Sequence, residues 1–395
     1  MNKKLIALAL AALPVAHAMA DVTIYGTIEA DMESSKTYAN AVKDANGKPK
    51  AVTHIDDTGS LLGFKGNEDL GNGLKAIWQV EQSLSIDGTT QPTNASNSSN
   101  TFATRDSFVG LQGAFGKVRL GKLSTFLNSD AGAPDAWIYG NGVNGLSYSS
   151  INQLDTRVNN AIRYDIPEFV AGLSGAVVYG VDETSTTNKK NQFSIGSTYT
   201  NSGYFGTFGY VRTANAYDGN KAANYWRLEG GYNANNILAA AYYGHSKLAA
   251  SSDVVYSNFA GATTGTAVSH KEAGLTLGYT IGAITPKFSY GRVWGASVEG
   301  GSDIKGHLNQ YVLGADYALS KRTTAYASYG FVQNSYRDST DNKYSNEHTV
   351  AVGVQHKFQF SLRELNLGKR TASAVLFLKK HKKEQRRKNL TKKKR

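Results

Sequence analysis

The alternation of apolar and polar residues at successive positions constrains the fold of this chain more than any other feature of its sequence. Between Val22 and Met32 every second residue is apolar or small, and the residues between them, from Thr23 to Asp31, are polar or amphipathic. Successive side chains of a β-strand point to opposite faces, so this pattern predicts a strand with one apolar face and one polar face in contact with water. At roughly ten residues, such a strand is also long enough to cross a bilayer at a tilt.

The same rhythm returns along the chain. It recurs in segments 74–81, 226–232, 272–279, 310–317, 324–331 and 350–358. The mean hydropathy is below zero, which by itself would indicate a soluble protein. In a membrane barrel only alternate residues face lipid, so average hydropathy does not decide the question.

The connections between these segments alternate in length. Seven are short, at 68–73, 113–116, 166–172, 201–203, 233–236, 282–284 and 320–322, and eight are long, at 34–58, 87–101, 124–157, 182–191, 213–224, 246–269, 296–308 and 335–347. We therefore predict an all-β fold, a 16-stranded antiparallel transmembrane β-barrel with short periplasmic turns and long extracellular loops. Closure satisfies the strand edges that lipid cannot, and a barrel of about sixteen strands leaves an aqueous channel.

The first twenty residues predict export. Lys3 and Lys4 precede an apolar run that ends in small residues at Ala20, which is typical of a Sec signal peptide (1–20) cleaved after Ala20. The chain has no cysteine, so disulfides and thiolate metal sites are excluded. We expect the mature protein in the bacterial outer membrane.

The net charge of +12 is confined to one end of the chain. Residues 359–395 hold 14 Lys and Arg against Glu364 and Glu384, while residues 21–358 hold 27 basic and 29 acidic residues. A folded basic face for nucleic acid is therefore not expected. We interpret 359–395 as a disordered tail. It is either a read-through or gene-model artefact, an extension that binds anionic lipid or lipopolysaccharide, or, least favoured, a nucleic-acid arm.

The sequence contains no clear catalytic motif. The histidines are scattered without metal-ligand spacing, and no Gly-x-Ser-x-Gly elbow is present. Two glycine-rich segments, 140–145 and 71–76, fit a dinucleotide fingerprint only loosely, because the first leads into no helical pattern and the second into a strand. We expect no enzyme, no cofactor and no metal site, although a barrel with hydrolase groups on its exterior stays a minor alternative.

Several sequence blocks resemble the neisserial and β-proteobacterial type of general outer-membrane porin. They are DVTIYG (21–26), LGFKGNEDLGNGLKAIW (62–78), RDSFVGL (105–111), FGKVRLG (115–121), IRYDIPE (162–168) and GVQHKF (353–358). The resemblance covers residues 1–358 in order. It implies a homotrimer of barrels that pass small hydrophilic solutes and ions, with the third long loop folded into the pore. It also implies that Phe358 is the terminal aromatic recognised during assembly, so the barrel domain is expected at 21–358.

Charges facing the lumen are the candidates for selectivity, because an ion that loses hydration at a constriction feels each fixed charge strongly. Strand parity puts a set of basic residues inside: Lys65, Lys75, Arg105, Arg119 and Arg163. The resemblance places Lys65, Arg105 and Arg163 opposite the inward loop, in which Asp130 and Asp135 are candidates for the acidic wall. Each of these could also be a solvated charge away from the narrowest point. The hypothesis is a general diffusion porin with mild anion preference.

A barrel that serves as an adhesin or a structural anchor is the rival interpretation. The loop 87–101, rich in Ser, Thr and Asn, is the sort of exposed surface that such a role would use, but it also fits a solvated loop tip. Conductance in a planar bilayer separates the two interpretations.

Overall fold

The computed structural model describes residues 21–36, 50–57, 59–88, 102–138, 146, 156–184, 187–217, 220–249, 267–300, 303–336 and 346–361. These segments contain seventeen strands and one short helix, α2: β1(Asp21–Lys36), β2(Val52–Asp56), β3(Leu61–Gly71), β4(Leu74–Ser83), β5(Ser107–Gly113), β6(Gly116–Ser124), α2(Phe126–Ser129), β7(Arg157–Asp165), β8(Leu173–Gly180), β9(Gln192–Asn201), β10(Tyr204–Tyr217), β11(Lys221–Ala234), β12(Ile237–Ala249), β13(Ala267–Tyr279), β14(Ile284–Val298), β15(His307–Ala318), β16(Thr323–Asn334) and β17(Glu347–Ser361). No helix in these segments is long and apolar enough to span a bilayer.

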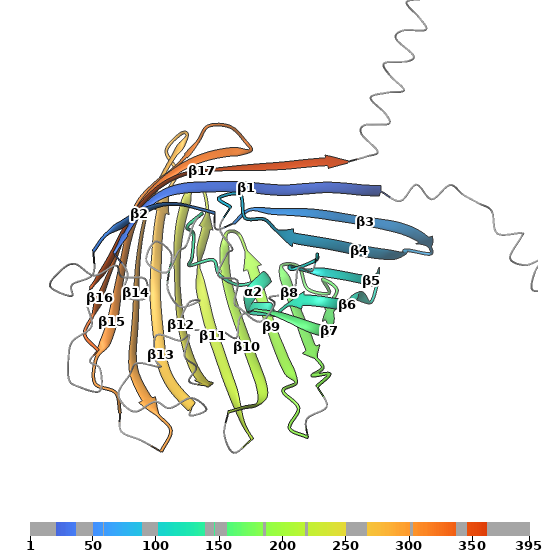
Figure 1. Ribbon diagram of the computed structural model, residues 1–395. Helices are drawn as coiled ribbons and strands as arrows, with labels where there is room; N and C mark the ends of the chain where they lie inside the picture. The colour runs from blue at the N-terminus through green and yellow to red at the C-terminus, as the bar shows by residue number, and fades with distance from the viewer. Residues whose placement is uncertain are drawn as a thin grey trace, which may run out of the picture.

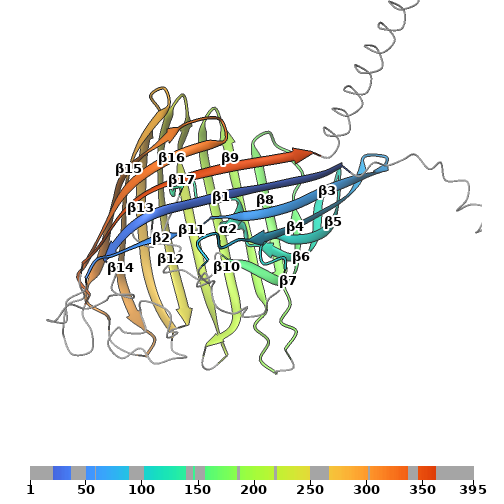
Figure 2. The same ribbon diagram turned by 45° about the horizontal axis from the view of Figure 1, so that its top comes forward.

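The strands form one antiparallel sheet that closes on itself (Figures 1 and 2). From β3 to β17 each strand pairs with its sequence neighbour, and β1 pairs with β17 over a long register, from Thr23 opposite Ser361 to Lys36 opposite His348. β2 and β3 both pair with the same side of β1, β2 near its end and β3 near its start. Together they fill one position in the wall, so the barrel has sixteen wall positions, as predicted.

The faces of the strands confirm the predicted parity. Leu275, Leu277, Val350, Val352 and Val354 are exposed on the outer face, while the alternating residues are enclosed. The enclosed set is strongly polar and includes Glu29, Asp31, Arg227, Glu229, Glu272, Thr276 and Lys287. A soluble protein has the opposite arrangement, because a continuous exposed apolar surface is unfavourable in water. In a bilayer it is the arrangement that lipid requires.

The short connections lie where predicted. Asn72 and Gly73 form the β3–β4 turn with φ of 52° and 76°, and Asn235 and Asn236 join β11 to β12 with φ of 51° and 66°. Left-handed residues at both central positions suit the twist of a two-residue hairpin, and Asn and Gly adopt them most easily.

Tyrosines mark the same rim of the barrel. Tyr164, Tyr199, Tyr204, Tyr279 and Tyr317 are exposed at the strand ends beside the short turns. Aromatic rings with a polar edge are favoured at the level of the lipid headgroups. Tyr25 does not belong to this girdle, because its hydroxyl donates to Glu81 inside the barrel.

The last strand runs beyond the predicted boundary. β17 extends to Ser361, so Phe358 is followed by three more strand residues. Phe358 pairs with Gly26 of β1, and its ring occupies the space that a side chain at Gly26 would need. The predicted signal peptide (1–20) and the tail beyond Ser361 lie outside the described residues.

Candidate pore and constriction

The loop after β6, the third of the predicted long loops, runs inside the barrel. It begins with α2, which lies within the ring of strands against β8, β9 and β10 (Figure 1). Thr125 caps the helix, because its Oγ1 accepts a hydrogen bond from the backbone N–H of Asn128 (3.3 Å). A cap of this kind satisfies one N–H group that a helix end otherwise leaves unpaired. The inward path that the resemblance implied is therefore present in residues 125–138.

Two glycines on the wall receive α2. Phe126 packs against Gly196 of β9 and Leu127 against Gly209 of β10, and these glycines are direct partners in the β9–β10 ladder. A Cβ at Gly196 would lie 2.1 Å from Phe126 Cδ1, and a Cβ at Gly209 would lie 2.4 Å from Leu127 Cδ2. The backbone N–H of Phe126 also donates to Ser194 Oγ (3.1 Å). The wall thus has a fitted seat for the start of the loop.

Beyond α2 the loop crosses the inner wall toward β14. The N–H of Gly132 donates to both carboxylate oxygens of Glu229 (3.0 Å each). Further along, Lys287 Nζ donates to the carbonyl of Ala136 (2.6 Å), and Trp137 Nε1 donates to Ser289 Oγ (2.9 Å). The hydroxyl of Thr276 donates to the carbonyl of Pro134. Strands β11, β13 and β14 therefore hold the loop by polar contacts.

Arg163 of β7 connects the wall to α2. It is 2% exposed, and its guanidinium donates to the carbonyl of Ser124 (3.0 Å), to Ser129 Oγ (2.7 Å), to Asp130 Oδ2 (2.6 Å) and to Asp165 Oδ1 (2.9 Å). Of the predicted pore residues, Arg163 and Asp130 are the basic and acidic pair that the structure brings into direct contact. Because this guanidinium is enclosed and fully hydrogen-bonded, its position is that of an anchor for the loop.

Arg105 lies at the start of a connected group of polar side chains on the wall. Its Nε donates to Glu81 Oε1, and the other Glu81 oxygen accepts from the Tyr25 hydroxyl (2.9 Å). Lys65 Nζ lies 4.9 Å from the centre of the Tyr25 ring, within range of a cation–π contact. Lys65 and Arg105 are thus joined through Tyr25 and Glu81, and the Arg105 charge has a partner close by.

The remaining predicted residues lie apart from this group. Arg119 of β6 makes a two-pronged contact with Asp165 (2.6 and 2.8 Å), and Lys75 is exposed near the β3–β4 turn. Asp135 is in the inward loop, where burial raises its pKa to about 6, although N–H groups of Leu146 and Trp137 and the cations Arg227 and Lys287 oppose the shift. Phe358 lies on β17 at the barrel seam and not in the pore.

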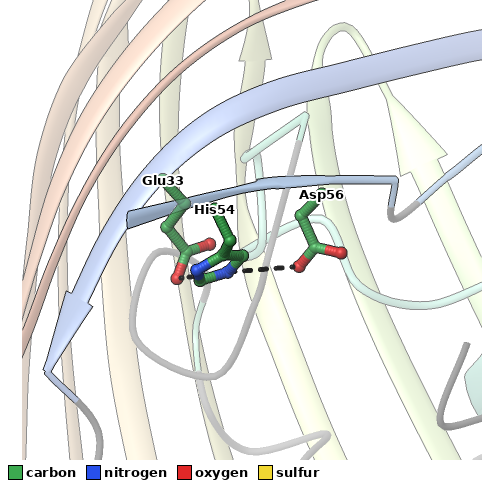
Figure 3. Close-up of side chains that lie close together, drawn as sticks. All are labelled: Glu33, His54 and Asp56. Carbon is green, nitrogen blue, oxygen red and sulfur yellow. Dashed lines mark ion pairs between the residues drawn. The ribbon is translucent and has the colours of Figure 1, made fainter. Parts of the chain in front are cut away.

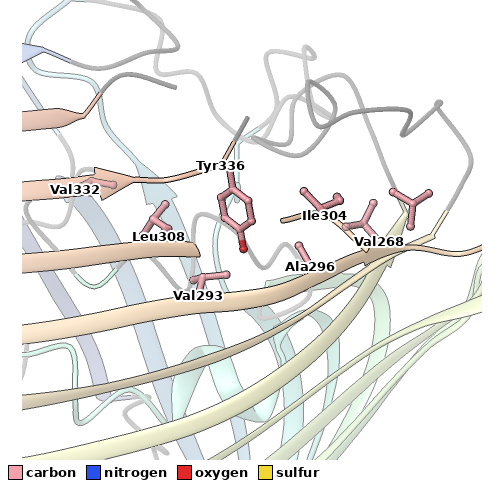
Figure 4. Packing of buried hydrophobic residues seen from close by; sticks show 8 residues of the cluster. Val268, Val293, Ala296, Ile304, Leu308, Val332 and Tyr336 are labelled. Atoms are coloured by element: carbon pink, nitrogen blue, oxygen red, sulfur yellow. The ribbon is translucent and has the colours of Figure 1, made fainter. Parts of the chain in front are cut away.

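An apolar cluster covers part of the inner wall near the long-loop ends of β13–β16 (Figure 4). Tyr336 and Ile304, from connections after β16 and β14, pack over Val268, Val293 and Leu308. These three strand residues break the polar-inside pattern because loop residues cover them. Water and ions are therefore excluded from this sector of the wall.

Several partners were missed from the sequence. Glu81, Asp106, Glu229 and Lys287 hold the loop or the predicted basic residues, and Asp106 does so by pairing with Arg157 (2.7 Å) and with Ser124. Strand parity could have placed Glu81, Glu229 and Lys287 inside the barrel. It could not have indicated which of them meets the loop, because that depends on the path of residues 125–138 across strands distant in sequence.

Comparison with known proteins gives matches along most of the chain. A profile described as Gram-negative porin matches residues 5–337. The major outer membrane protein P.IB of Neisseria meningitidis serogroup B (strain H44/76, serotype 15) is 39% identical over 365 residues, which is 91% of this chain and 100% of that protein. The protein of the same name from Neisseria gonorrhoeae is 37% identical over 386 residues, with the same coverage.

Solved structures share the fold. An anion-selective porin from Comamonas acidovorans has a TM-score of 0.64 at 23% identity, covering 86% of this chain and 100% of that one. Salmonella typhi OmpF, in a complex with daunomycin, has a TM-score of 0.60 at 17% identity, covering 87% and 99%. At these identities the likeness extends to the barrel fold alone.

Proposed function

The chain belongs to the Gram-negative porin family, and we propose that it is a general diffusion porin with a mild preference for anions. It is an outer-membrane protein, and its channel passes ions and small hydrophilic solutes down their gradients. The observation that carries the proposal is a closed sheet with an apolar outside and a polar lumen, narrowed by a loop fixed to the inner wall. We propose no catalytic role for it.

We propose that the charged residues around the inward loop set the selectivity. The set is Lys65, Lys75, Arg105, Arg119, Arg163, Asp130 and Asp135. Within this set, Arg163 and Asp130 hold the loop against the wall. Lys65 and Arg105 belong to the connected group of wall side chains that also contains Tyr25 and Glu81. Fixed positive charge beside a narrow aqueous path favours anions.

Reversal potentials in a planar bilayer test the preference. With a tenfold KCl gradient, we expect a value of anion sign for the unmodified channel and a smaller one for Arg105→Gln. Arg322→Gln is the matched control, because Arg322 lies in the β15–β16 turn, away from the loop. A reversal potential of cation sign refutes the preference, and a bilayer that stays closed favours the adhesin or anchor alternative.

We propose a homotrimer that contacts lipopolysaccharide. Lys271 of β13 and Arg292 of β14 are exposed on the outer face toward the long-loop ends of their strands, where the aromatic pair Tyr243 and Trp294 also lies (6.1 Å between ring centres). Cations beside amphipathic rings suit lipid phosphates at the headgroup level. Native mass spectrometry should give three chains. Lipopolysaccharide retention should fall in Lys271→Gln/Arg292→Gln but not in Lys321→Gln, which changes a turn residue.

We propose that the aromatic at Phe358 serves as the assembly signal and that the basic tail is absent from the mature protein. The support is its place at the seam, where Phe358 meets Gly26. The intact mass of protein extracted from outer membranes tests this proposal. A product that retains residues 362–395 would refute it and would make lipid binding by the tail the leading alternative.

A further inference from the structure

Three metal-ligating side chains converge on the lumen side of β1 and β2 (Figure 3). His54 Nε2 lies 3.8 Å from Glu33 Oε1 and 3.8 Å from Asp56 Oδ2. One ligand atom from each of the three residues lies within 4.8 Å of the others. Glu33 comes from β1, and His54 and Asp56 come from β2, so the cluster depends on how the two strands pair.

The register places a further carboxylate beside the cluster. Glu33 is directly opposite His54, and Asp31 is directly opposite Asp56, so the four residues form a two-by-two square on one face of the strand pair. Directly opposed residues have Cβ atoms about 5 Å apart. The Asp31 side chain is therefore next to the cluster of three.

Asp31 has an oxygen without a protein partner. The residue is 4% exposed, and its Oδ2 accepts a distant hydrogen bond from the Tyr326 hydroxyl (3.4 Å). Its Oδ1 is fully enclosed and has no hydrogen-bond partner among the described residues. An enclosed carboxylate oxygen without a partner is costly, because the group has lost water and gained nothing in exchange. This oxygen is an independent indication that a ligand belongs beside it.

We propose that Glu33, His54, Asp56 and Asp31 bind a zinc-type divalent cation. Tetrahedral zinc with bonds of about 2.1 Å places its ligand atoms roughly 3.4 Å apart, so the 3.8 Å separations of His54 from Glu33 and from Asp56 need only a small inward movement. One imidazole nitrogen with carboxylate oxygens favours zinc and similar transition metals over calcium or magnesium, which bind oxygen. A doubly charged cation would also offset most of the charge of three carboxylates.

The site has an entry path. The His54 side chain is 38% exposed, while Glu33 is 1% exposed. The imidazole therefore forms the open side of the site, and the carboxylates of β1 form its floor. The binding proposal is independent of the proposed channel function, because binding is measured without current.

Zinc titration of the full chain in detergent tests the proposal. By calorimetry we expect a site in the unmodified protein whose Kd rises about tenfold or more in His54→Ala and in Glu33→Gln. The matched control is His356→Ala, because His356 is an exposed β17 histidine that contacts Thr323 and lies outside the cluster. Affinity should fall as the pH is lowered, since protons compete with the cation for the imidazole and carboxylate ligands. Cobalt in place of zinc should give the absorption of a tetrahedral site, and His54→Ala should remove it.

Two results overturn the proposal. One is an unmodified protein with no zinc-dependent heat up to millimolar metal, and the other is a His54→Ala variant that binds as the unmodified protein does. Histidines elsewhere, His381 of the tail included, could bind zinc weakly, so only the difference between variants counts. Folding of each variant is checked by its β-sheet circular dichroism. If His54→Ala does not fold, Asp56→Asn is judged by the same criterion.

Discussion

Removing the Arg163 guanidinium should release the inward loop from the wall. In Arg163→Ala, α2 loses the bonds from Arg163 to Ser129 Oγ and Asp130 Oδ2, whereas the bond to Asp165 lies within β7 and does not depend on the loop. A hydrogen bond to a charged group contributes about 1.5–3 kcal/mol. The Asp130 side chain is 34% exposed, which reduces its share through solvent screening, so we take about 2 kcal/mol for the pair of contacts. This corresponds to a roughly 30-fold rise in the undocked population.

The absence of cysteine makes that population measurable. Leu127 is 2% exposed, so a Leu127→Cys thiol reacts with a soluble reagent only when α2 leaves the wall. When opening is fast, the labelling rate follows the open population. We expect the rate in Arg163→Ala to be roughly 30-fold above that in the otherwise unmodified background.

Arg119→Ala is the control, because Arg119 shares the Asp165 partner but, among the described residues, no hydrogen bond or ion pair joins it to α2. Its labelling rate should stay close to that of the background, because Arg163 keeps its bonds to Ser129 Oγ and Asp130 Oδ2 in this variant. In a double-mutant cycle, Asp130→Asn should add little to Arg163→Ala. Equal labelling in Arg163→Ala and the background would refute the assignment of Arg163 as the anchor.

Three further predictions use the same chain. Gly196→Ala places a Cβ 2.1 Å from Phe126 Cδ1, and overpacking of about 1–2 kcal/mol should raise the labelling rate of Leu127→Cys about tenfold. Gly206→Ala is the control, because a Cβ there meets open space and should leave the rate unchanged. Equal rates in the two variants would contradict the close packing of α2 against Gly196. Burial raises the pKa of Asp135 to about 6 from 3.8, so the docked loop binds a proton more tightly than the released loop. The proton-linked share of the docking stability should therefore be fully present at low pH and lost as pH rises through 6. The labelling rate of Leu127→Cys, corrected for thiol ionisation, should fall roughly tenfold from pH 7 to pH 5. Asp135→Asn should make this rate independent of pH over the same range. Truncation after Phe358 deletes Gln359, Phe360 and Ser361 from the β1–β17 seam, so heat stability in detergent should fall relative to truncation after Ser361, and equal stability would show that the extra pairs contribute nothing.

The sequence predicts the barrel well because period-two alternation is a local property. The neighbouring residues alone predict that Leu275 lies on the outer face of the sheet and Glu272 on the inner face. The turn at Asn72 and Gly73 is predicted from those two residues themselves. The division of one wall position into β2 and β3 was not predicted, since residues 34–58 read as a single long connection. Asp57 contributes to that break, where its carboxylate oxygens accept from the N–H groups of Ser60 and Ile86.

The site was predicted less well, because its contacts depend on pairing between strands far apart in the chain. Parity places Arg163 in the lumen, but the seat made by Gly196 and Gly209 exists only once β9 pairs with β10. The cluster of Glu33 and His54 likewise follows from the β1–β2 register. No spacing within one segment carries either signal.

The pairing of lumen cations with neighbouring carboxylates explains why we expect only a mild preference for anions from so many charged residues. Most lumen cations near the loop have a carboxylate in contact: Arg105 with Glu81, Arg119 with Asp165, Arg157 with Asp106, Arg163 with Asp130, Arg227 with Glu229 and Lys287 with Asp316. Each pair acts on a passing ion as a dipole, whose field falls with distance faster than that of a single charge, and salt shortens its range further. In the described part of the chain, Lys65 and Lys75 have no such ion pair, so they act as single charges. Removing both members of a pair, as in Arg105→Gln/Glu81→Gln, should therefore move the reversal potential less than Lys65→Gln, which removes an unpaired positive charge.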